Sequence, residues 1–204
     1  AAEPEPRLIA HRGGVVDDEL IENSAPALEE AIARGYWMVE VDIQESKDGR
    51  LVVHHDKNFA RYYGDKHTVG ELTWDEIRQL RSEPGGSSPL SFEEYAELCK
   101  GRIRVMLDTK PPAHGPKFYE NMLAALQEND LLSTAYVIGT DESKNHFLDK
   151  ARVGIDIEGL EAAVDAGENV SQRYFLFMHG NQLTEEIVRR AMELDVPVVP
   201  SVNI

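Results

Sequence analysis

Short apolar runs alternate with amphipathic stretches along almost the whole chain, and this alternation restricts the fold more than any other feature. A short apolar run is typical of a buried strand, whereas apolar residues spaced by three and four positions are typical of a helix. Strands alternating with helices predict βα units and a parallel sheet. The expected strands are residues 7–10, 37–43, 51–54, 103–107, 135–138, 153–157, 174–178 and 196–199. The expected helices are residues 24–33, 73–81, 91–99, 117–128, 160–170 and 184–194, with N-cap residue types at Ser24 and Thr184.

Polar residues at the ends of the expected strands favour a barrel over an open sheet. No strand is followed by G-x-G-x-x-G or G-x-x-x-x-G-K-[ST], the loops that bind nucleotides in many open sheets. The polar strand-end residues are His11, Arg12, Glu40, Asp42, His54, His55, Asp56, Asp108, Lys110, His179 and Asn203. Because a (β/α)8 barrel assembles its active site from many strand ends, we predict an α/β fold of the TIM type. Such barrels typically need about 250 residues, so we allow for a barrel that is incomplete at its C-terminus.

One domain over residues 1–204 is expected, with an insertion at about residues 57–100. This insertion separates the expected strands at 51–54 and 103–107, holds two of the helices and contains the Gly- and Pro-rich stretch 82–89. We expect it to pack near the site.

The composition excludes several classes of partner. Lys and Arg supply 21 positive charges against 37 negative ones, and the net charge of −16 argues against nucleic acid or an anionic membrane surface. No run of about 18 apolar residues predicts a membrane span. Cys99 is the only cysteine, which excludes an internal disulfide and a thiolate zinc cluster. The sequence leaves the compartment and the oligomeric state open, although the Pro- and Glu-containing start, residues 1–6, slightly favours an exported or periplasmic protein.

Two carboxylates mark the expected strand at 37–43. Glu40 and Asp42 are two positions apart, so both project from one face, and they alternate with the apolar residues Val39, Val41 and Ile43. Adjacent carboxylates repel unless a cation or a proton lies between them, and hard cations such as Mg²⁺ or Ca²⁺ take oxygen ligands. The pattern predicts a metal site, with an edge strand carrying ordinary surface acids as the alternative.

A second pair repeats this geometry near residue 108. Asp108 and Lys110 share a face, so Asp108 can complete a metal shell while Lys110 holds an anionic group. A plain ion pair at the barrel rim is the alternative.

Two histidines and an arginine follow other strands. His11 and His55 have the side chain suited to proton transfer near neutral pH, although a single His is more often a core or surface residue. Arg12 offers a planar fork for phosphate oxygens, and Gly13 and Gly14 permit close approach of a ligand to the backbone.

Between residues 8 and 110 the chain resembles the glycerophosphodiester phosphodiesterase family of the PLC-like phosphodiesterase superfamily. The matching motifs are His11-Arg12-Gly13, Glu22-Asn23, Glu40-x-Asp42, Asp48-Gly49, His55-Asp56 and Asp108-x-Lys110. The resemblance implies a TIM-type barrel that hydrolyses glycerophosphodiesters to glycerol 3-phosphate and an alcohol. It implies that a divalent cation, Mg²⁺ or Ca²⁺, is held by Glu40, Asp42 and Asp108. It also implies an acid/base pair, His11 and His55, and substrate-binding residues, Arg12, Lys110, Glu22 and Asn23.

Two departures from the family keep other functions open. The family usually has Glu where this chain has Asp108, and a Trp-Thr-x-Asn strand where this chain reads Pro-Ser-Val-Asn at 200–203. The carboxylate set Glu, Asp and Asp also resembles sphingomyelinase D and phospholipase D toxins, which carry disulfides that this chain lacks. A catalytically silent binding barrel is the remaining alternative, although no expected catalytic residue is lost.

Overall fold

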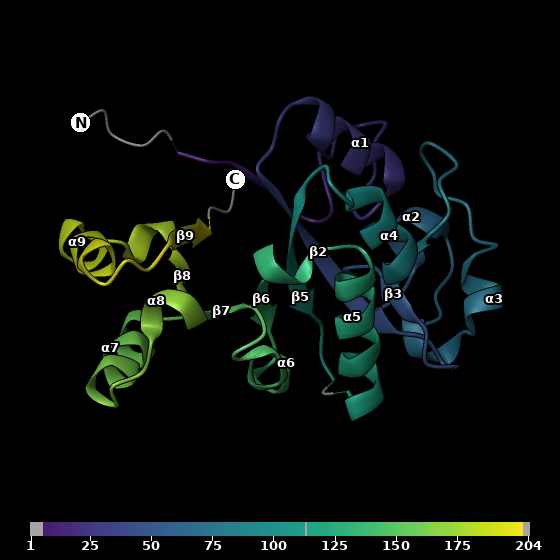
Figure 1. The fold of residues 1–204 in the computed structure, drawn as a ribbon. Helices are drawn as coiled ribbons and strands as arrows, with labels where there is room; N and C mark the ends of the chain where they lie inside the picture. Colours follow the sequence, from purple (N-terminus) through teal and green to yellow (C-terminus); the bar gives the residue numbers. More distant parts are fainter. Residues whose placement is uncertain (1–5, 113, 202–204) are drawn as a thin grey trace.

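The computed structural model describes residues 6–112 and 114–201, arranged as shown in Figure 1. Nine strands form one sheet in the order β4-β3-β2-β5-β6-β7-β8-β9, with β1 paired to β2. The strands are β1 (Ile9–Ala10), β2 (Met38–Glu45), β3 (Leu51–Val53), β4 (Leu90–Ser91), β5 (Arg104–Thr109), β6 (Tyr136–Gly139), β7 (Arg152–Ile155), β8 (Tyr174–His179) and β9 (Val198–Ser201). The helices are α1 (Ala25–Ala33), α2 (Ala60–Tyr63), α3 (Trp74–Ile77), α4 (Phe92–Cys99), α5 (Pro116–Glu128), α6 (Asp141–Phe147), α7 (Ile157–Asp165), α8 (Val170–Arg173) and α9 (Glu185–Glu193). Three short 3-10 helices complete the set: η1 (Val69–Glu71), η2 (Leu132–Thr134) and η3 (Gly180–Gln182).

Seven strands run parallel, as the alternation of strands and helices predicts. The expectation that residues 51–54 belong to this parallel set is wrong, because β3 pairs antiparallel with β2 and β4 pairs antiparallel with β3. Only Ser46–Arg50 separates β2 from β3, whereas a parallel crossover needs a dozen or more residues. A hairpin is therefore the only short connection available.

The side chains of β2 alternate between two environments. Val39 and Val41 belong to the main hydrophobic core. Met38 belongs to a separate cluster on the concave face of the sheet, which also contains Met106 and Tyr136. The two-residue period of a strand places Glu40 and Asp42 on the same face as Met38. The inner face of the sheet is thus apolar at its middle and acidic toward the carboxyl end of β2.

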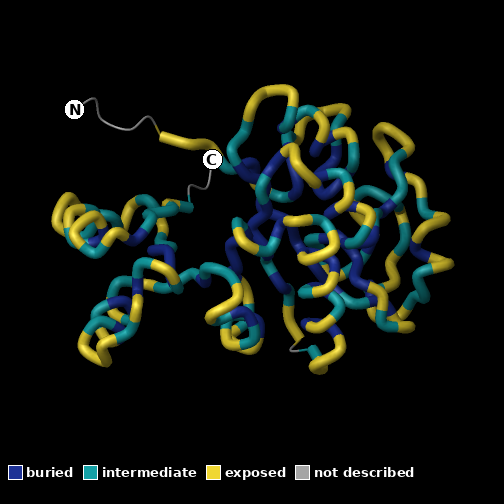
Figure 2. The backbone as a smooth tube through the Cα atoms, viewed as in Figure 1, coloured by how far each residue is buried: buried dark blue, intermediate teal, exposed yellow. Residues whose placement is uncertain are grey.

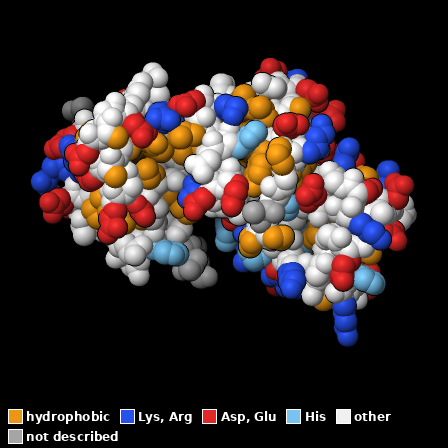
Figure 3. Space-filling view, turned by 90° about the horizontal axis from the view of Figure 1, so that it is seen from below, with side chains coloured by type: hydrophobic (Ala, Val, Ile, Leu, Met, Phe, Trp, Pro, Cys, Tyr) orange, Lys and Arg blue, Asp and Glu red, His pale blue; other side chains and the backbone are white. Residues whose placement is uncertain are grey.

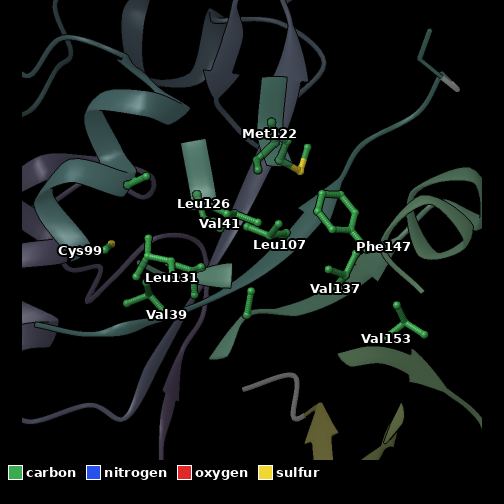
Figure 4. Packing of buried hydrophobic residues seen from close by; sticks show 14 of the residues in the cluster. Val39, Val41, Cys99, Leu107, Met122, Leu126, Leu131, Val137, Phe147 and Val153 are labelled. Carbon is green, nitrogen blue, oxygen red and sulfur yellow. The ribbon is translucent and has the colours of Figure 1, made fainter. Parts of the chain in front are cut away.

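The main core lies between the outer face of the sheet and the helices. Figure 4 shows Val41 of β2 and Leu107 of β5 packed beneath Met122 and Leu126 of α5. Ser24 caps α1 by accepting a hydrogen bond from the backbone N of Ala27 at 3.3 Å, and Thr184 caps α9 in the same way. Both predicted N-caps are confirmed.

Some helix boundaries differ from those expected. The helix expected at 160–170 is two helices, α7 and α8, because the chain turns at Gly167, whose φ of 74° favours glycine. Helices α2 and α6 escaped prediction, since α2 has only four residues and α6 is largely polar.

The last third of the chain is less deeply buried than the first two thirds. In Figure 2 the segment from β7 to β9 shows fewer buried residues than the body formed by β1–β6 and α1–α5. Within the described residues, no hydrogen-bonded pairing joins β1 to β9, so the sheet curves without closing by hydrogen bonds. The open interior forms a cavity of about 2320 Å³. No helix of the described segments combines the length and apolar character needed to cross a membrane.

Candidate active site

Three carboxylates meet at the carboxyl ends of β2 and β5. Asp42 and Asp108 are paired across the two strands, and Glu40 lies two residues before Asp42 on the same face. The three side chains each place a carboxylate oxygen within 4.8 Å of the others. Glu40 and Asp42 are buried, so the alternative of an exposed edge strand with surface acids is excluded.

The three carboxylates of this cluster need a positive charge nearby if they are to be ionised together. Burial, followed by the charge of Asp42, raises the pKa of Glu40 well above its usual value, and burial likewise raises the pKa of Asp108. Glu40 Oε1 is buried without a hydrogen-bond partner, which is costly for a carboxylate. Three clustered oxygen donors with an unpartnered atom fit a hard divalent cation, so these residues form a group able to bind a metal ion.

Lys110 supplies one positive charge beside the carboxylates. Its Nζ lies 2.8 Å from Asp42 Oδ1 and donates a hydrogen bond to Asp108 Oδ2 at 2.6 Å. Burial alone would lower the pKa of Lys110, but the carboxylates of Asp42 and Asp108 raise it. The lysine is therefore charged, and one cation faces three acidic groups.

The turn after β1 is built around backbone conformations that favour glycine. Gly13 has a φ of 77°, and a Cβ at this position would lie 2.7 Å from the Cα of Asn23. The close approach lets Asn23 N donate to the carbonyl of Arg12 at 2.7 Å. Asn23 Nδ2 in turn donates to Asp42 Oδ2 at 2.8 Å, which fixes that carboxylate. Tyr95 of α4 donates to the carbonyl of Gly13 at 2.8 Å, so the region from 57 to 100 supports this turn directly.

Arg12 and Arg61 converge on one buried carboxylate. Arg12 Nη1 donates to Glu22 Oε2 at 2.8 Å, and Arg61 of α2 donates through Nη2 to Glu22 Oε1. Arg12 also donates its backbone N–H to Glu40 Oε2 at 2.8 Å, while its Nε is buried without a partner. This unpartnered N–H leaves Arg12 able to donate a hydrogen bond to an anionic oxygen.

The two histidines contact different carboxylates of the site. His11 Nε2 is 3.8 Å from Glu40 Oε2, and the His11 side chain is 69% exposed. His55 Nδ1 is 2.8 Å from Asp56 Oδ1 and 4.0 Å from Glu22 Oε1. Because a carboxylate only accepts, Nδ1 of His55 carries the proton and its Nε2 holds a free lone pair. Desolvation and then the charge of Arg12 lower the pKa of His11.

The structure brings together the residues that the sequence singled out. The contacts above join His11, Arg12, Glu22, Asn23, Glu40, Asp42, His55, Asp108 and Lys110 into one network. Asp48 lies elsewhere and accepts hydrogen bonds from Ser46 and from the backbone of Trp74, so it holds the β2–β3 turn. His179 is exposed at the end of β8, within 3.0 Å of Ser201 Oγ, and Asn203 lies outside the described residues.

Two residues at the site escaped sequence reasoning. Arg61 lies on a four-residue helix inside the region from 57 to 100. This helix is too short to show an apolar periodicity that would predict which of its sides faces the barrel. Gln44 donates to the carbonyls of His54 and Asp56, both at 2.8 Å, and so fixes the loop that carries His55. The position of Gln44, two residues beyond Asp42 on one strand, was the available signal.

Residues 11–152 match the Glycerophosphoryl diester phosphodiesterase family. The chain belongs to this family. Among curated proteins, it is 39% identical over 77 residues to Lysophospholipase D GDPD3 of Mus musculus, covering 38% of this chain and 23% of that protein. It is 32% identical over 108 residues to a glycerophosphodiester phosphodiesterase of Bacillus altitudinis, covering 50% of this chain and 43% of that protein. The chain thus spans less than half the length of either relative.

The solved structures of family members share the fold of this chain. A phosphodiesterase from Oleispira antarctica, solved in complex with the product sn-glycerol-3-phosphate, superposes with a TM-score of 0.78 over 97% of this chain and 85% of that one. At 18% sequence identity this likeness establishes the fold. The predicted TIM-type α/β barrel fold and the predicted family are confirmed.

Proposed function

We propose that this chain hydrolyses glycerophosphodiesters to glycerol 3-phosphate and an alcohol. The observation that carries the proposal is the meeting of three buried carboxylates with Lys110 and Arg12 at one end of the barrel. His11 and His55 flank this group. The product found in the Oleispira antarctica phosphodiesterase has the chemistry proposed here, a phosphate monoester of glycerol.

The proposed metal is Mg²⁺ or Ca²⁺, held by Glu40, Asp42 and Asp108. When bound, such a cation supplies positive charge to the non-bridging phosphate oxygens, whose negative charge grows in the transition state. Lys110 and the unpartnered Nε of Arg12 supply the same kind of stabilisation from the protein. Asn23 holds Asp42 in place throughout.

The two histidines divide the proton transfers. With Nδ1 held by Asp56, His55 presents an unprotonated Nε2 that takes the proton from the attacking hydroxyl group. Protonated His11, whose lowered pKa makes it a stronger acid, gives its proton to the oxygen of the departing alcohol. The attacking group is the glycerol hydroxyl next to the phosphate, so the P–O bond to the alcohol breaks as the new P–O bond forms and a cyclic phosphate results. Water then opens this ring: His11 takes the proton of the water and His55 returns its proton to the glycerol oxygen, which gives glycerol 3-phosphate and restores both histidines.

The cavity is large compared with the head group of a small glycerophosphodiester. Its volume of about 2320 Å³ exceeds the roughly 300–1,000 Å³ of most small-molecule pockets. We propose a small glycerophosphodiester as the substrate.

Turnover of glycerophosphocholine and glycerophosphoethanolamine with Mg²⁺, Ca²⁺ or EDTA tests the proposal. We expect hydrolysis that EDTA abolishes and one of the two cations restores. A folded, cation-binding protein that turns over neither compound would contradict the proposed substrate class.

A further inference from the structure

The inner face of the barrel changes character from one end to the other. On β5, the residues that face the interior are Arg104, Met106 and Asp108 in order from the amino end. Met106 belongs to the interior apolar cluster, and Asp108 belongs to the carboxylate group described above. The interior is therefore acidic at the carboxyl ends of the strands and apolar in the middle. At the amino ends it carries the cationic residue Arg104.

Arg104 is one of three arginines that gather at the amino ends of the strands. The guanidinium carbon of Arg104 lies 4.9 Å from the centroid of the Trp37 ring, and that of Arg7 lies 5.4 Å from the same ring. Trp37 packs edge-on against Tyr136, with ring centroids 5.8 Å apart. Arg152 is paired with Tyr136 across β6 and β7. All five side chains line the barrel cavity.

The positive charge of these arginines is not offset nearby. Within residues 6–112 and 114–201, Arg7, Arg104 and Arg152 make no ion pair with a carboxylate. This is unusual in a chain with a net charge of −16, whose acidic side chains are spread over the face shown in Figure 3. Burial raises the pKa of Tyr136, and the charges that oppose this rise are those of the same three arginines.

The cluster offers donors without a matching acceptor. Arg152 is held in place by donating Nη1 to the backbone carbonyls of Ser171 and Tyr174, which leaves its charge uncompensated. Trp37 Nε1 is buried and has no hydrogen-bond partner. An indole N–H and three guanidinium groups can only donate. An anion with several acceptor oxygens matches both these donors and their positive charge.

We propose that the amino end of the barrel holds a second anion site, formed by Arg7, Trp37, Arg104 and Arg152, that binds a phosphate group. A phosphate has several acceptor oxygens and close to two negative charges at neutral pH, and guanidinium forks match its geometry. Inorganic phosphate and a phosphate monoester share this chemistry. The site lies at the opposite end of the strands from Glu40, Asp42 and Asp108, so it is separate from the proposed reaction.

The fluorescence of Trp37 reports directly on this site. The chain has two tryptophans, and Trp74→Phe removes the other one, which lies on α3. In this background, with EDTA present, inorganic phosphate and glycerol 3-phosphate are titrated separately at constant ionic strength. We expect a saturable change in Trp37 fluorescence with at least one of them, and the tighter ligand identifies the source of the phosphate group.

Paired variants assign the signal to the site. Arg104→Gln with Arg152→Gln should weaken phosphate binding at least tenfold. Arg78→Gln with Arg81→Gln, which removes two exposed charges from the region 57–100, should leave it unchanged. Arg7→Gln, at an exposed position, should weaken binding severalfold and serves as the test if the double variant does not fold.

Two results would overturn the proposal. One is a phosphate response that survives the loss of Arg104 and Arg152, or of Arg7, and disappears in Lys110→Ala, since the ligand would then occupy the catalytic end. The other is an equal response to sodium chloride, which would show only screening of charge. Neither result contradicts phosphodiester hydrolysis, so the two proposals fail separately.

Discussion

Asp42 of β2 and Asp108 of β5 are paired across neighbouring parallel strands, and Lys110 Nζ lies within 2.8 Å of a carboxylate oxygen of each. Strand register alone therefore brings two acidic groups together, and Lys110, the residue directly after β5, lies between them. With Glu40 added, the site has three acidic groups and one ammonium group. This imbalance makes the cluster depend on a further cation. Burial, to which the charge of Asp42 adds, raises the pKa values of Glu40 and Asp108.

Glu40→Gln should weaken divalent-cation binding by roughly 10–100-fold, since it replaces a charged ligand with a neutral one and ligand-shell changes have effects of this size. In the presence of EDTA the same variant should melt at a higher temperature than the wild type, because the substitution removes the repulsion between Glu40 and Asp42. Titration calorimetry and thermal melts measure both effects. Glu45→Gln is the matched control, since Glu45 ends the same strand and contacts His114 instead. Equal cation affinity in Glu40→Gln and the wild type would make the acidic pair purely structural.

His11→Ala and His55→Ala should each lower kcat by about 10²–10⁴-fold, the usual contribution of general acid–base catalysis, without unfolding the protein. The reason is that each removes one of the two proton-transfer groups beside the carboxylates. His67→Ala is the control, because His67 is exposed and pairs only with Asp65 in the described residues. Steady-state kinetics with circular dichroism checks this, and wild-type turnover in both alanine variants would remove the histidines from the mechanism.

Arg61→Gln should lower kcat by about 10–100-fold, as expected for a residue that orients the groups in contact with the substrate. Arg61 donates to Asp56 at 2.8 and 2.9 Å and also to Glu22, so its loss frees the partners of His55 and Arg12. Because Asp56 orients His55, the loss should appear in kcat more than in KM. A rise in KM at unchanged kcat would contradict this orienting role. Arg50→Gln, which loses only a 3.4 Å surface pair with Glu93, should retain wild-type kinetics.

The parts of the site that lie on regular strands were open to prediction from sequence. Glu40 and Asp42 on β2 face one side because a strand has a period of two, and the same period joins Asp108 to Lys110. Arg61 was not predictable in this way. It reaches Glu22 across 39 positions of sequence, from a four-residue helix with no apolar periodicity to orient it. The antiparallel β3 was missed for a related reason, because an apolar run indicates a buried strand without its direction.

Cys99 should resist thiol reagents in the folded protein. It is fully buried on α4, and burial raises its pKa to about 12, so almost no thiolate exists at pH 8. We expect no reaction with Ellman's reagent under native conditions and one thiol per chain in urea. Cys99→Ala should fold and retain activity, with a modest loss of stability for the lost packing. A stoichiometric reaction under native conditions would show that α4 opens readily.

His54 should make the protein less stable as the pH falls. It is buried against Phe59, with ring centroids 4.4 Å apart, and its Nε2 donates to the carbonyl of Asn58 at 2.9 Å. Burial lowers the pKa of His54 in the folded state below the value of about 6.5 for an unfolded chain. Between these two pKa values the unfolded state binds more protons, so the free energy of unfolding rises with pH there and levels off above about pH 6.5. As the pH drops below 6.5, this contribution is lost.

His54→Phe separates this effect from the titration of the carboxylates, which is common to both proteins. Urea unfolding with EDTA at pH 7.5 should show the variant less stable by about 1 kcal/mol, because the Asn58 carbonyl loses its donor. Between pH 7.5 and 5.5 the variant should lose less stability than the wild type, since phenylalanine takes up no proton. His67→Phe, at an exposed site in the same region, should follow the wild-type slope. Parallel slopes for His54→Phe and the wild type would mean that His54 is not held neutral by burial.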